Sequence, residues 1–231
     1  MKNLSLTNNQ LKIIAMLTML SDHIGKEIFP QYEFLQIIGR LSFPIFAFMI
    51  AEGCFYTRNR LRYFLTVSLL GTGCQLVYFI AENSLYQNIL ITFSLSIILI
   101  FALENLRVKK EKRAVFLSAL SVAAVIFICF GLPVVFKIQG FQIDYGFSGV
   151  LLPVVVFFAP DRKWKLISTS IILIFLTFEL QEPLQLFALL AIPLLALYNQ
   201  KRGKYNIKPL FYIFYPAHLV VIYFISLFLN K

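Results

Sequence analysis

Residues 114–136 read AVFLSALSVAAVIFICFGLPVVF, a run that contains no Lys, Arg, Asp or Glu. A helix needs about 20 apolar residues to cross the hydrocarbon core of a bilayer, so this run alone is long enough. The run is continuously apolar and has no period of two, which favours a helix over a strand of a β-barrel. The chain is therefore predicted to be an integral membrane protein.

The composition of the whole chain agrees with this interpretation. Of its 231 residues, 59% are hydrophobic, 14% are charged and 25 are Phe, and the mean hydropathy is +0.80. Soluble domains carry about 25% charged residues. A soluble domain of this size cannot bury so much apolar surface, so the lipid bilayer has to cover the excess.

Eight further apolar segments flank this run. The nine expected spans are 9–28, 34–57, 62–81, 87–105, 114–136, 146–159, 166–180, 184–198 and 209–229. Pro153, Pro183 and Pro193 interrupt segments six to eight, which makes these three segments candidates for broken or re-entrant helices. The expected fold is an all-α polytopic transmembrane bundle of about nine spans, with residues 1–231 in a single domain.

The basic residues follow every second segment. The basic connections contain Arg58, Arg60, Arg62, Arg107, Lys109, Lys110, Lys112, Arg113, Arg162, Lys163, Lys165, Lys201, Arg202, Lys204 and Lys208. The alternate connections hold Lys26 and Lys137 as their only cations. The positive-inside rule then places the N-terminus in the cytoplasm and the C-terminus outside the cell membrane. The net charge of +10 is thus a topology signal, and no basic domain interleaved with aromatics indicates nucleic-acid binding.

No metal site is expected. Cys54, Cys74 and Cys129 each lie inside an apolar run, and their spacing fits no zinc or redox motif. They are interpreted as small apolar filler.

Ionisable side chains inside the expected spans are the candidate functional residues, because each costs roughly 3 kcal/mol to insert when charged. They are Lys12, Asp22, His23, Arg40, Glu52 and His218, together with Asp144 at the mouth of segment six. By depth, Lys12 and Glu52 belong to an inner layer and the other five to an outer layer. Lys12 and His23 are eleven residues apart, which on a helix is about 16 Å along the axis and nearly the same face.

Each of these residues also has a purely structural interpretation. Lys12 can extend to the cytoplasmic headgroups, and Glu52 can pair with a neighbouring arginine. Asp22 and Arg40 can neutralise each other as an ion pair. His218, which is one of only two histidines, can be an ordinary buried histidine of the bundle.

The residues around these positions resemble a known family. The stretches 11–25 (LKIIAMLTMLSDHIG), 38–48 (IGRLSFPIFAF) and 51–54 (AEGC) resemble the opening of the TraX family of integral membrane proteins. Asp144-Tyr145-Gly146 and the stretch 211–219 (FYIFYPAHL) resemble its later motifs. The resemblance implies acetylation of the N-terminus of a conjugative pilin subunit. It also implies a distant similarity to membrane acyltransferases that modify envelope sugars. Those enzymes carry a basic residue, ten further residues and then a histidine, a spacing that Lys12 and His23 match.

Acyl transfer requires a base that takes a proton from an amine or hydroxyl, and His23 suits this role. A carboxylate, Asp22 or Asp144, is expected to orient its imidazole. Arg40 or His218 is expected to stabilise the tetrahedral intermediate.

The donor is expected to be acetyl-CoA, which is cytoplasmic and anionic. Lys12, with Glu52 in the same inner layer, is the expected donor-binding position. The acceptor is expected to be an exported pilin-like peptide or an envelope glycan. Two other functions fit the same residues: a proton-linked transporter or flippase, and a non-enzymatic assembly factor for surface appendages.

Overall fold

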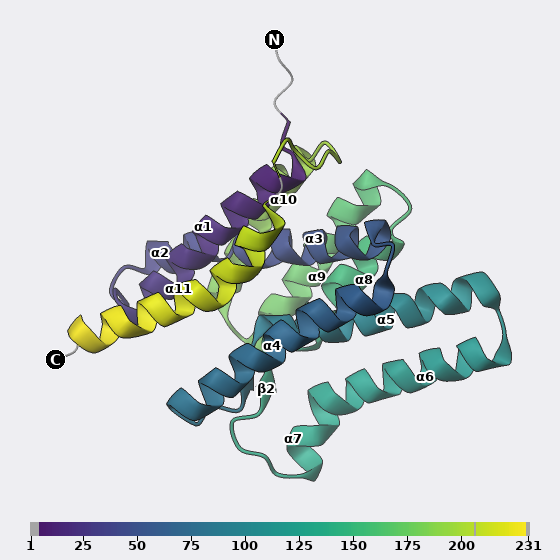
Figure 1. Ribbon diagram of the computed structural model, residues 1–231, viewed down its shortest axis with the longest axis horizontal. Coiled ribbons are helices and arrows are strands. Elements are labelled where there is room, and N and C mark those ends of the chain that lie inside the picture. The colour runs from purple at the N-terminus through teal and green to yellow at the C-terminus, as the bar shows by residue number, and fades with distance from the viewer. Residues whose placement is uncertain (1–4, 206, 230–231) are drawn as a thin grey trace. The chain divides into compact units, whose positions relative to one another are not determined.

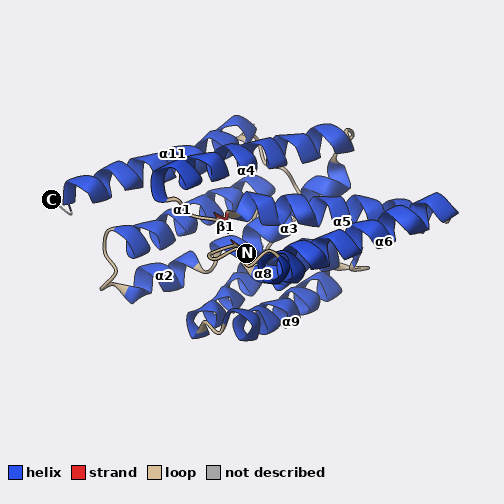
Figure 2. Cartoon of the chain, turned by 90° about the horizontal axis from the view of Figure 1, so that it is seen from below, coloured by secondary structure: helices blue, strands red, loops and turns tan. Residues whose placement is uncertain are grey.

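The computed structural model describes residues 5–205 and 207–229, and helices account for most of them (Figures 1 and 2). The chain divides into two compact units. Unit 1 comprises Met1–Met49 and Arg162–Lys231, and unit 2 comprises Ile50–Asp161. Helix α3 (Ser42–Tyr56) continues from the first unit into the second. The all-α prediction is confirmed, while the single-domain organisation stays a prediction.

In unit 1, α1 packs against both α2 and α11, and α9 packs against η2 and α10 (Figure 1). The elements of this unit are α1 (Asn8–Glu27), α2 (Glu33–Gly39), the first part of α3, α9 (Arg162–Leu180), the 3-10 helix η2 (Pro183–Leu190), α10 (Ala191–Ala196) and α11 (Lys208–Leu229). Helix α1 is thus the element that links the short α2 to the C-terminal helix.

At the start of α1, backbone N–H groups form hydrogen bonds with the helix cap and with the loop before α11. The Thr7 hydroxyl accepts from the backbone N–H of Gln10, and the Gln10 side chain accepts from the N–H of Thr7. The backbone N–H of Asn8 donates to the carbonyl of Lys201 over 2.8 Å. These bonds satisfy N–H groups that have no partner within the helix. They also hold a basic loop against the N-terminal end of α1.

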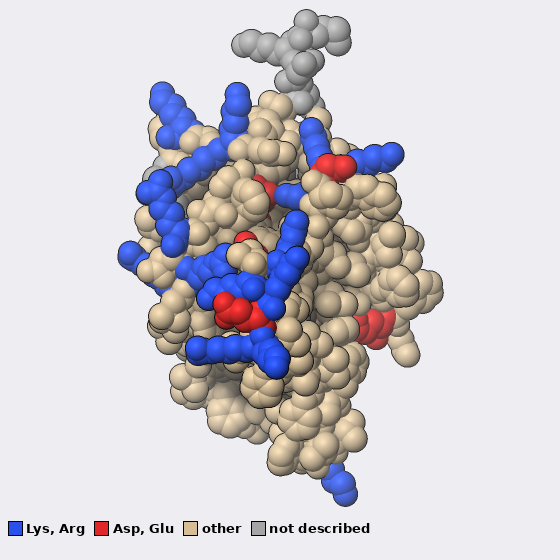
Figure 3. Space-filling model, turned by 90° about the vertical axis from the view of Figure 1, so that its right-hand side faces the viewer, with Lys and Arg blue, Asp and Glu red and all other residues tan. Residues whose placement is uncertain are grey.

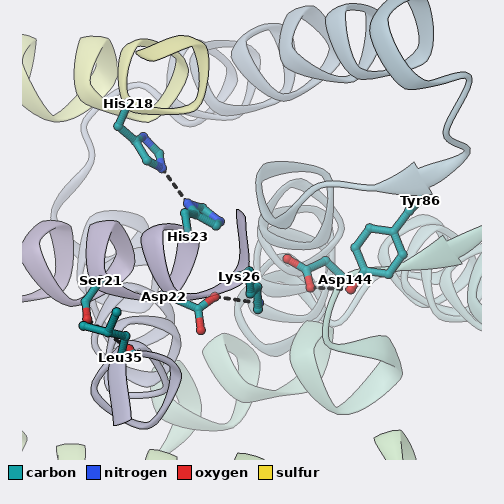
Figure 4. Close-up of polar contacts among 8 residues, drawn as sticks. All are labelled: Ser21, Asp22, His23, Lys26, Leu35, Tyr86, Asp144 and His218. Atoms are coloured by element: carbon teal, nitrogen blue, oxygen red, sulfur yellow. Dashed lines mark hydrogen bonds and ion pairs between the residues drawn. The ribbon is translucent and has the colours of Figure 1, made fainter. Parts of the chain in front are cut away.

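Small residues let α1 and α2 cross in close contact. A Cβ built on Gly39 would lie 2.2 Å from the Cβ of Asp22, and one on Gly25 would lie 2.8 Å from the Cβ of Leu35. The Ser21 hydroxyl donates to the carbonyl of Leu35 over 3.0 Å (Figure 4). Residue numbers fall along α1 as they rise along α2, so the two helices are antiparallel.

The single helix expected over 34–57 is instead two helices. Helix α2 ends at Gly39, Arg40 caps it, and α3 begins at Ser42. Pro44 explains the break, because it has no N–H to donate to the carbonyl of Arg40 in a continuous helix and its ring would collide with that carbonyl. In the first turn of a new helix the same proline is tolerated.

Unit 2 is built around α5, which packs against α4, α6 and α8. Its elements are the end of α3, α4 (Arg60–Glu82), β1 (Tyr86–Gln87), α5 (Ile89–Lys109), α6 (Lys112–Ile126), the π-helical turn η1 (Phe127–Gly131), α7 (Leu132–Val135), β2 (Gln142–Ile143) and α8 (Gly146–Phe158). The π turn lies just before Pro133, whose ring does not fit a regular α-helical turn. The run 114–136 is therefore helical throughout but changes its helix type.

Polar contacts join loops at both ends of unit 2. Arg60 Nη2 lies 2.6 Å from Glu104 Oε2, which joins the start of α4 to the last turns of α5. At the other end, β1 and β2 pair in parallel and the Tyr86 hydroxyl donates to Asp144 Oδ1 over 2.7 Å. Within this unit, alternate loops therefore gather at the same end, as an up-and-down bundle requires.

Among residues 5–205 and 207–229, five helical segments are long and apolar enough to cross a membrane. They are Glu33–Tyr56, Arg60–Glu82, Ile89–Lys109, Lys112–Val135 and Pro209–Leu229, and two shorter apolar ones are Gly146–Phe158 and Pro183–Ala196. Large apolar side chains are exposed, among them Ile80 (82%) and Phe228 (77%), and Figure 3 shows broad areas without charged side chains. The chain is therefore a membrane protein. Nine spans stay a prediction, because α1 and α9 carry too many polar residues to qualify by composition.

The α1–α2 crossing generates a stability prediction. Gly39→Ala places a Cβ inside the contact distance of Asp22, so the helices must separate and the protein should lose about 1–3 kcal/mol. The matched control is Gly73→Ala in α4, where an added Cβ meets nothing within 4 Å. Thermal unfolding in detergent should show a lower Tm for Gly39→Ala only. Equal Tm values for both variants would contradict the close crossing.

Candidate functional site

One face of α1 directs two of the candidate residues at α11. Lys12 Nζ lies 5.2 Å from the ring centroid of Phe211, and His23 contacts His218. Both partners belong to α11, so the expectation that Lys12 and His23 share a face of α1 is confirmed. Helix α1 and helix α11 run in the same direction where they touch, since the lower-numbered residues pair with each other (Figure 1).

The two histidines of the chain form a hydrogen-bonded pair, here called the histidine pair. His23 Nδ1 lies 2.8 Å from His218 Nε2, and the two ring planes are stacked with centroids 4.9 Å apart (Figure 4). These residues are 195 positions apart in the sequence. Two imidazole rings, whose nitrogens can each donate or accept a hydrogen bond, are thus in direct contact.

His218 is held in one orientation by its own helix. It is 5% exposed, and its Nδ1 lies 2.8 Å from the carbonyl oxygen of Phe214. Its ring stacks on Phe214 at 4.9 Å and meets Tyr215 edge-on at 5.8 Å. Both ring nitrogens of His218 are therefore engaged, one by its own helix and one by His23.

Asp22 is directed at α2 and not at the histidine pair. It is buried, and its Oδ2 lies 2.6 Å from Lys26 Nζ (Figure 4). Arg40 is also buried, at the end of α2. Within residues 5–205 and 207–229, neither Asp22 Oδ1 nor Arg40 Nε has a hydrogen-bond partner. The ion pair between Asp22 and Arg40 that the sequence allowed is therefore not formed.

Asp144 and Glu52 belong to unit 2. The Asp144 carboxylate accepts from Tyr86, and its backbone carbonyl accepts from the Thr92 hydroxyl over 2.8 Å, so Asp144 joins the loop before α8 to β1 and α5. Glu52 is buried in α3. The expected grouping of these two residues with candidates of unit 1 stays a prediction.

Sequence reasoning missed Gln185, which lies in η2. Its side chain is 0% exposed, and over the described part of the chain neither amide atom has a hydrogen-bond partner. Leaving such a group unpaired costs about 1–3 kcal/mol. The sequence signal that would have identified Gln185 is a single amide side chain in an otherwise apolar segment.

Cations and aromatic rings gather at the N-terminal end of α1, here called the basic end of unit 1. Lys165 Nζ lies 5.6 Å over the ring of Phe48, and that ring meets Tyr198 edge-on at 5.9 Å. Tyr198 in turn pairs with Leu6, just before α1. The members of this basic end are Lys12, Lys165, Lys201, Arg202 and Lys204. An anion would meet positive charge from three separate elements here.

The described ranges contain no group of three or more His, Cys, Asp or Glu side chains that could hold a metal ion. The side chains of unit 1 offer proton transfer at the histidine pair and anion binding at the basic end.

A protein-family model covers most of the chain. Residues 7–226 match the family model described as "TraX protein". The chain belongs to the TraX family. This member is similar to the probable fimbrial assembly protein FimC, serogroup H1, of Dichelobacter nodosus, at 26% identity over 99% of each chain. It is also similar to an uncharacterized protein of Rickettsia prowazekii (strain Madrid E), at 28% identity over 73% of this chain and 63% of that protein. No solved structure matches this TraX protein.

The unpaired amide of Gln185 generates a second stability prediction. Gln185→Leu removes a buried polar group without partners, so it should stabilise the protein by about 1 kcal/mol. Gln75→Leu is the matched control, because the Gln75 amide donates to Tyr86 O and accepts from Asn88 N and Nδ2. That control should destabilise by about 1–3 kcal/mol. Thermal unfolding of both variants in detergent should therefore give Tm shifts of opposite sign. A lower Tm for Gln185→Leu would show that its amide has a partner.

Proposed function

We propose that this TraX-family protein is a membrane-embedded acyltransferase. It transfers an acetyl group from acetyl-CoA to an exported pilin-like peptide or to an envelope glycan. The observation that carries the proposal is the histidine pair, which lies on the face of α1 that also presents Lys12. A basic residue and a histidine on one face of a helix can bind an anion and act as a base, with a fixed distance between the two side chains.

The proposed reaction needs one base. His23 takes a proton from the acceptor amine or hydroxyl while the acceptor nitrogen or oxygen attacks the thioester carbonyl carbon. The carbon–sulfur bond then breaks, and the CoA thiolate takes the proton back from His23. Acetylated acceptor and free CoA are the products, and His23 returns to its starting state.

The donor is proposed to bind at the basic end of unit 1. CoA carries several phosphates, and Lys and Arg are the side chains that bind phosphate. Lys12 lies about 16 Å from His23 along α1, which leaves room for the pantetheine arm to extend from the phosphates to the base. Glu52 is proposed to contribute to the same inner layer.

The oxyanion of the tetrahedral intermediate needs a hydrogen-bond donor or a cation. Arg40 is proposed for this role, because its buried Nε is unused by the described residues.

A role in pilus assembly fits the relatives. A similar protein of Dichelobacter nodosus carries the name probable fimbrial assembly protein. A pilin-like acceptor is therefore proposed. The same name favours a second function, a non-enzymatic assembly factor, which would need neither a donor site nor a base.

The protein is proposed to lie in the cell membrane with nine spans, the N-terminus in the cytoplasm and the C-terminus outside. In support, the N-terminal end of α1 lies against Tyr198 and the loop that begins there, and Lys165 lies over Phe48, which also contacts Tyr198. Two basic connections of unit 1 and the N-terminal end of α1 thus share one end, which the positive-inside rule assigns to the cytoplasm.

Reporter fusions test this topology. Alkaline phosphatase fused after residue 231 should be active, because the enzyme folds only outside the cytoplasm, and a fluorescent protein at the same position should stay dark. The same reporters inserted in the basic loop 107–113 are the control and should give the reverse pattern. An inactive phosphatase and a fluorescent reporter protein at residue 231 would place the C-terminus in the cytoplasm. The number of spans would then be even.

Two substitutions test the enzyme proposal. His23→Ala should lower the rate of acetyl transfer by roughly 10² to 10⁴, because the base is removed, while membrane abundance stays normal. Lys12→Ala should instead raise the KM for acetyl-CoA with a smaller effect on kcat, because it weakens donor binding. The assay is acceptor-dependent release of free CoA from labelled acetyl-CoA by purified protein in detergent.

The structural interpretations give different results in that assay. If Lys12 only reaches the headgroups, its variant keeps wild-type kinetics. If His23 only stabilises the fold, its variant loses abundance and not turnover. Equal turnover per molecule in wild type and His23→Ala would rule out His23 as the base. If no acceptor increases the release of free CoA by wild type or by either variant, the assembly factor is favoured.

A further inference from the structure

The hydrogen bonds of His218 determine where its ring proton lies. Its Nδ1 contacts the carbonyl oxygen of Phe214 at 2.8 Å, and a carbonyl oxygen can only accept. Nδ1 of His218 must therefore carry the hydrogen. A neutral imidazole has one N–H, so His218 Nε2 is unprotonated and can only accept.

The same logic extends to His23. Its Nδ1 lies 2.8 Å from His218 Nε2, so His23 Nδ1 has to donate. The one N–H of a neutral His23 is then used, and its Nε2 carries a free lone pair. Within residues 5–205 and 207–229, that Nε2 has no hydrogen-bond partner.

Neutral rings are the form that this location favours. Both residues lie on helices of a membrane protein, and a charged imidazolium carries an insertion cost that neutral histidine avoids. If His218 were charged, its Nε2 would donate to His23 and the order of donors would reverse. The carboxylate nearest in sequence, Asp22, is paired with Lys26.

We propose that His218 is a positioning residue that holds His23 in the Nδ1–H tautomer, which leaves His23 Nε2 as the atom that accepts the proton. The identity of the reaction rests on the proposed function above, whereas the tautomer assignment rests on the two hydrogen bonds and on the neutral form of both rings. His218 therefore orients the His23 imidazole, the role for which the sequence predicted Asp22 or Asp144. In this proposal it does not donate a hydrogen bond to the tetrahedral intermediate.

This arrangement supports the base without burying a negative charge. When His23 Nε2 gains a proton, the bond from its Nδ1–H to His218 becomes charge-assisted and stronger. His218 cannot pass a proton onward, because the next acceptor is the Phe214 carbonyl. The pair therefore orients and stabilises like the aspartate–histidine pair of a serine hydrolase, but with a neutral partner suited to an apolar surrounding.

The first test is spectroscopic and needs no substrate. The chain has two histidines, so ¹⁵N-histidine labelling of the full protein in detergent gives two ring systems, and His218→Gln identifies which is which. At mildly alkaline pH, both rings should show a protonated Nδ1 and an unprotonated Nε2. An Nε2–H tautomer at either ring would overturn the proposal.

The second test is kinetic. In His218→Gln the side-chain oxygen still accepts from His23 Nδ1–H, so kcat should stay within about tenfold of wild type, whereas His218→Ala should lose roughly 10²-fold in kcat with the KM for acetyl-CoA unchanged. Val221→Ala, at an exposed position of α11, is the matched truncation control and should behave as wild type. Equal losses for Gln and Ala would overturn the positioning role.

The two tests separate the two proposals. If both rings have the expected tautomer but no acceptor supports CoA release, the proposed function fails and the tautomer assignment stands. If CoA release depends on His23 while the ring of His23 is the Nε2–H tautomer, the enzyme stands and the role of His218 fails.

Discussion

A polar side chain buried among apolar helices is costly to leave without a hydrogen-bond partner, and that partner comes from its own helix or from a neighbouring one. In unit 1, helix α1 carries three neighbouring polar side chains to which this constraint applies: Ser21, Asp22 and His23. Its polar side chains divide between two neighbours: Ser21 and Asp22 are directed at α2, whereas His23 is directed at α11. Successive positions on a helix point about 100° apart, so Ser21 and His23, which are about 200° apart around α1, face different helices.

This division has a structural requirement, which is that α2 lies very close to α1. Gly39 meets the buried side of Asp22, and Gly25 meets Leu35, so the two backbones approach without side chains between them. The short α2 is possible because the chain breaks its helix before Pro44 and begins again at Ser42. The packing of the unit therefore depends on two glycines and one proline as much as on its apolar residues.

The same division explains why a histidine, and not an aspartate, contacts His23. Asp22 faces α2 and pairs through Oδ2 with Lys26 of its own helix, whereas His23 faces α11 and meets His218. A neutral partner suits a position surrounded by apolar helices, because it provides an acceptor without the cost of a buried charge. Lys12 lies on this same α11 side, beside Phe211. The proposed base and Lys12, the proposed donor-binding residue of α1, therefore both lie at the interface between α1 and α11.

The sequence by itself determined which segments are helical, that the protein belongs in a membrane, and that Lys12 and His23 share a face of α1. It did so because backbone hydrogen bonds, helix period and hydrophobicity all act within one segment or its neighbours. Only the tertiary structure decided that His23 meets His218, 195 residues away, and that Asp22 pairs with Lys26. It alone showed that Gln185 is buried with no hydrogen-bond partner among the residues that the structure describes. Those outcomes depend on which helices pack together and on how each is rotated about its axis. Both are set by side-chain packing between distant segments, which the local pattern of any one segment does not contain.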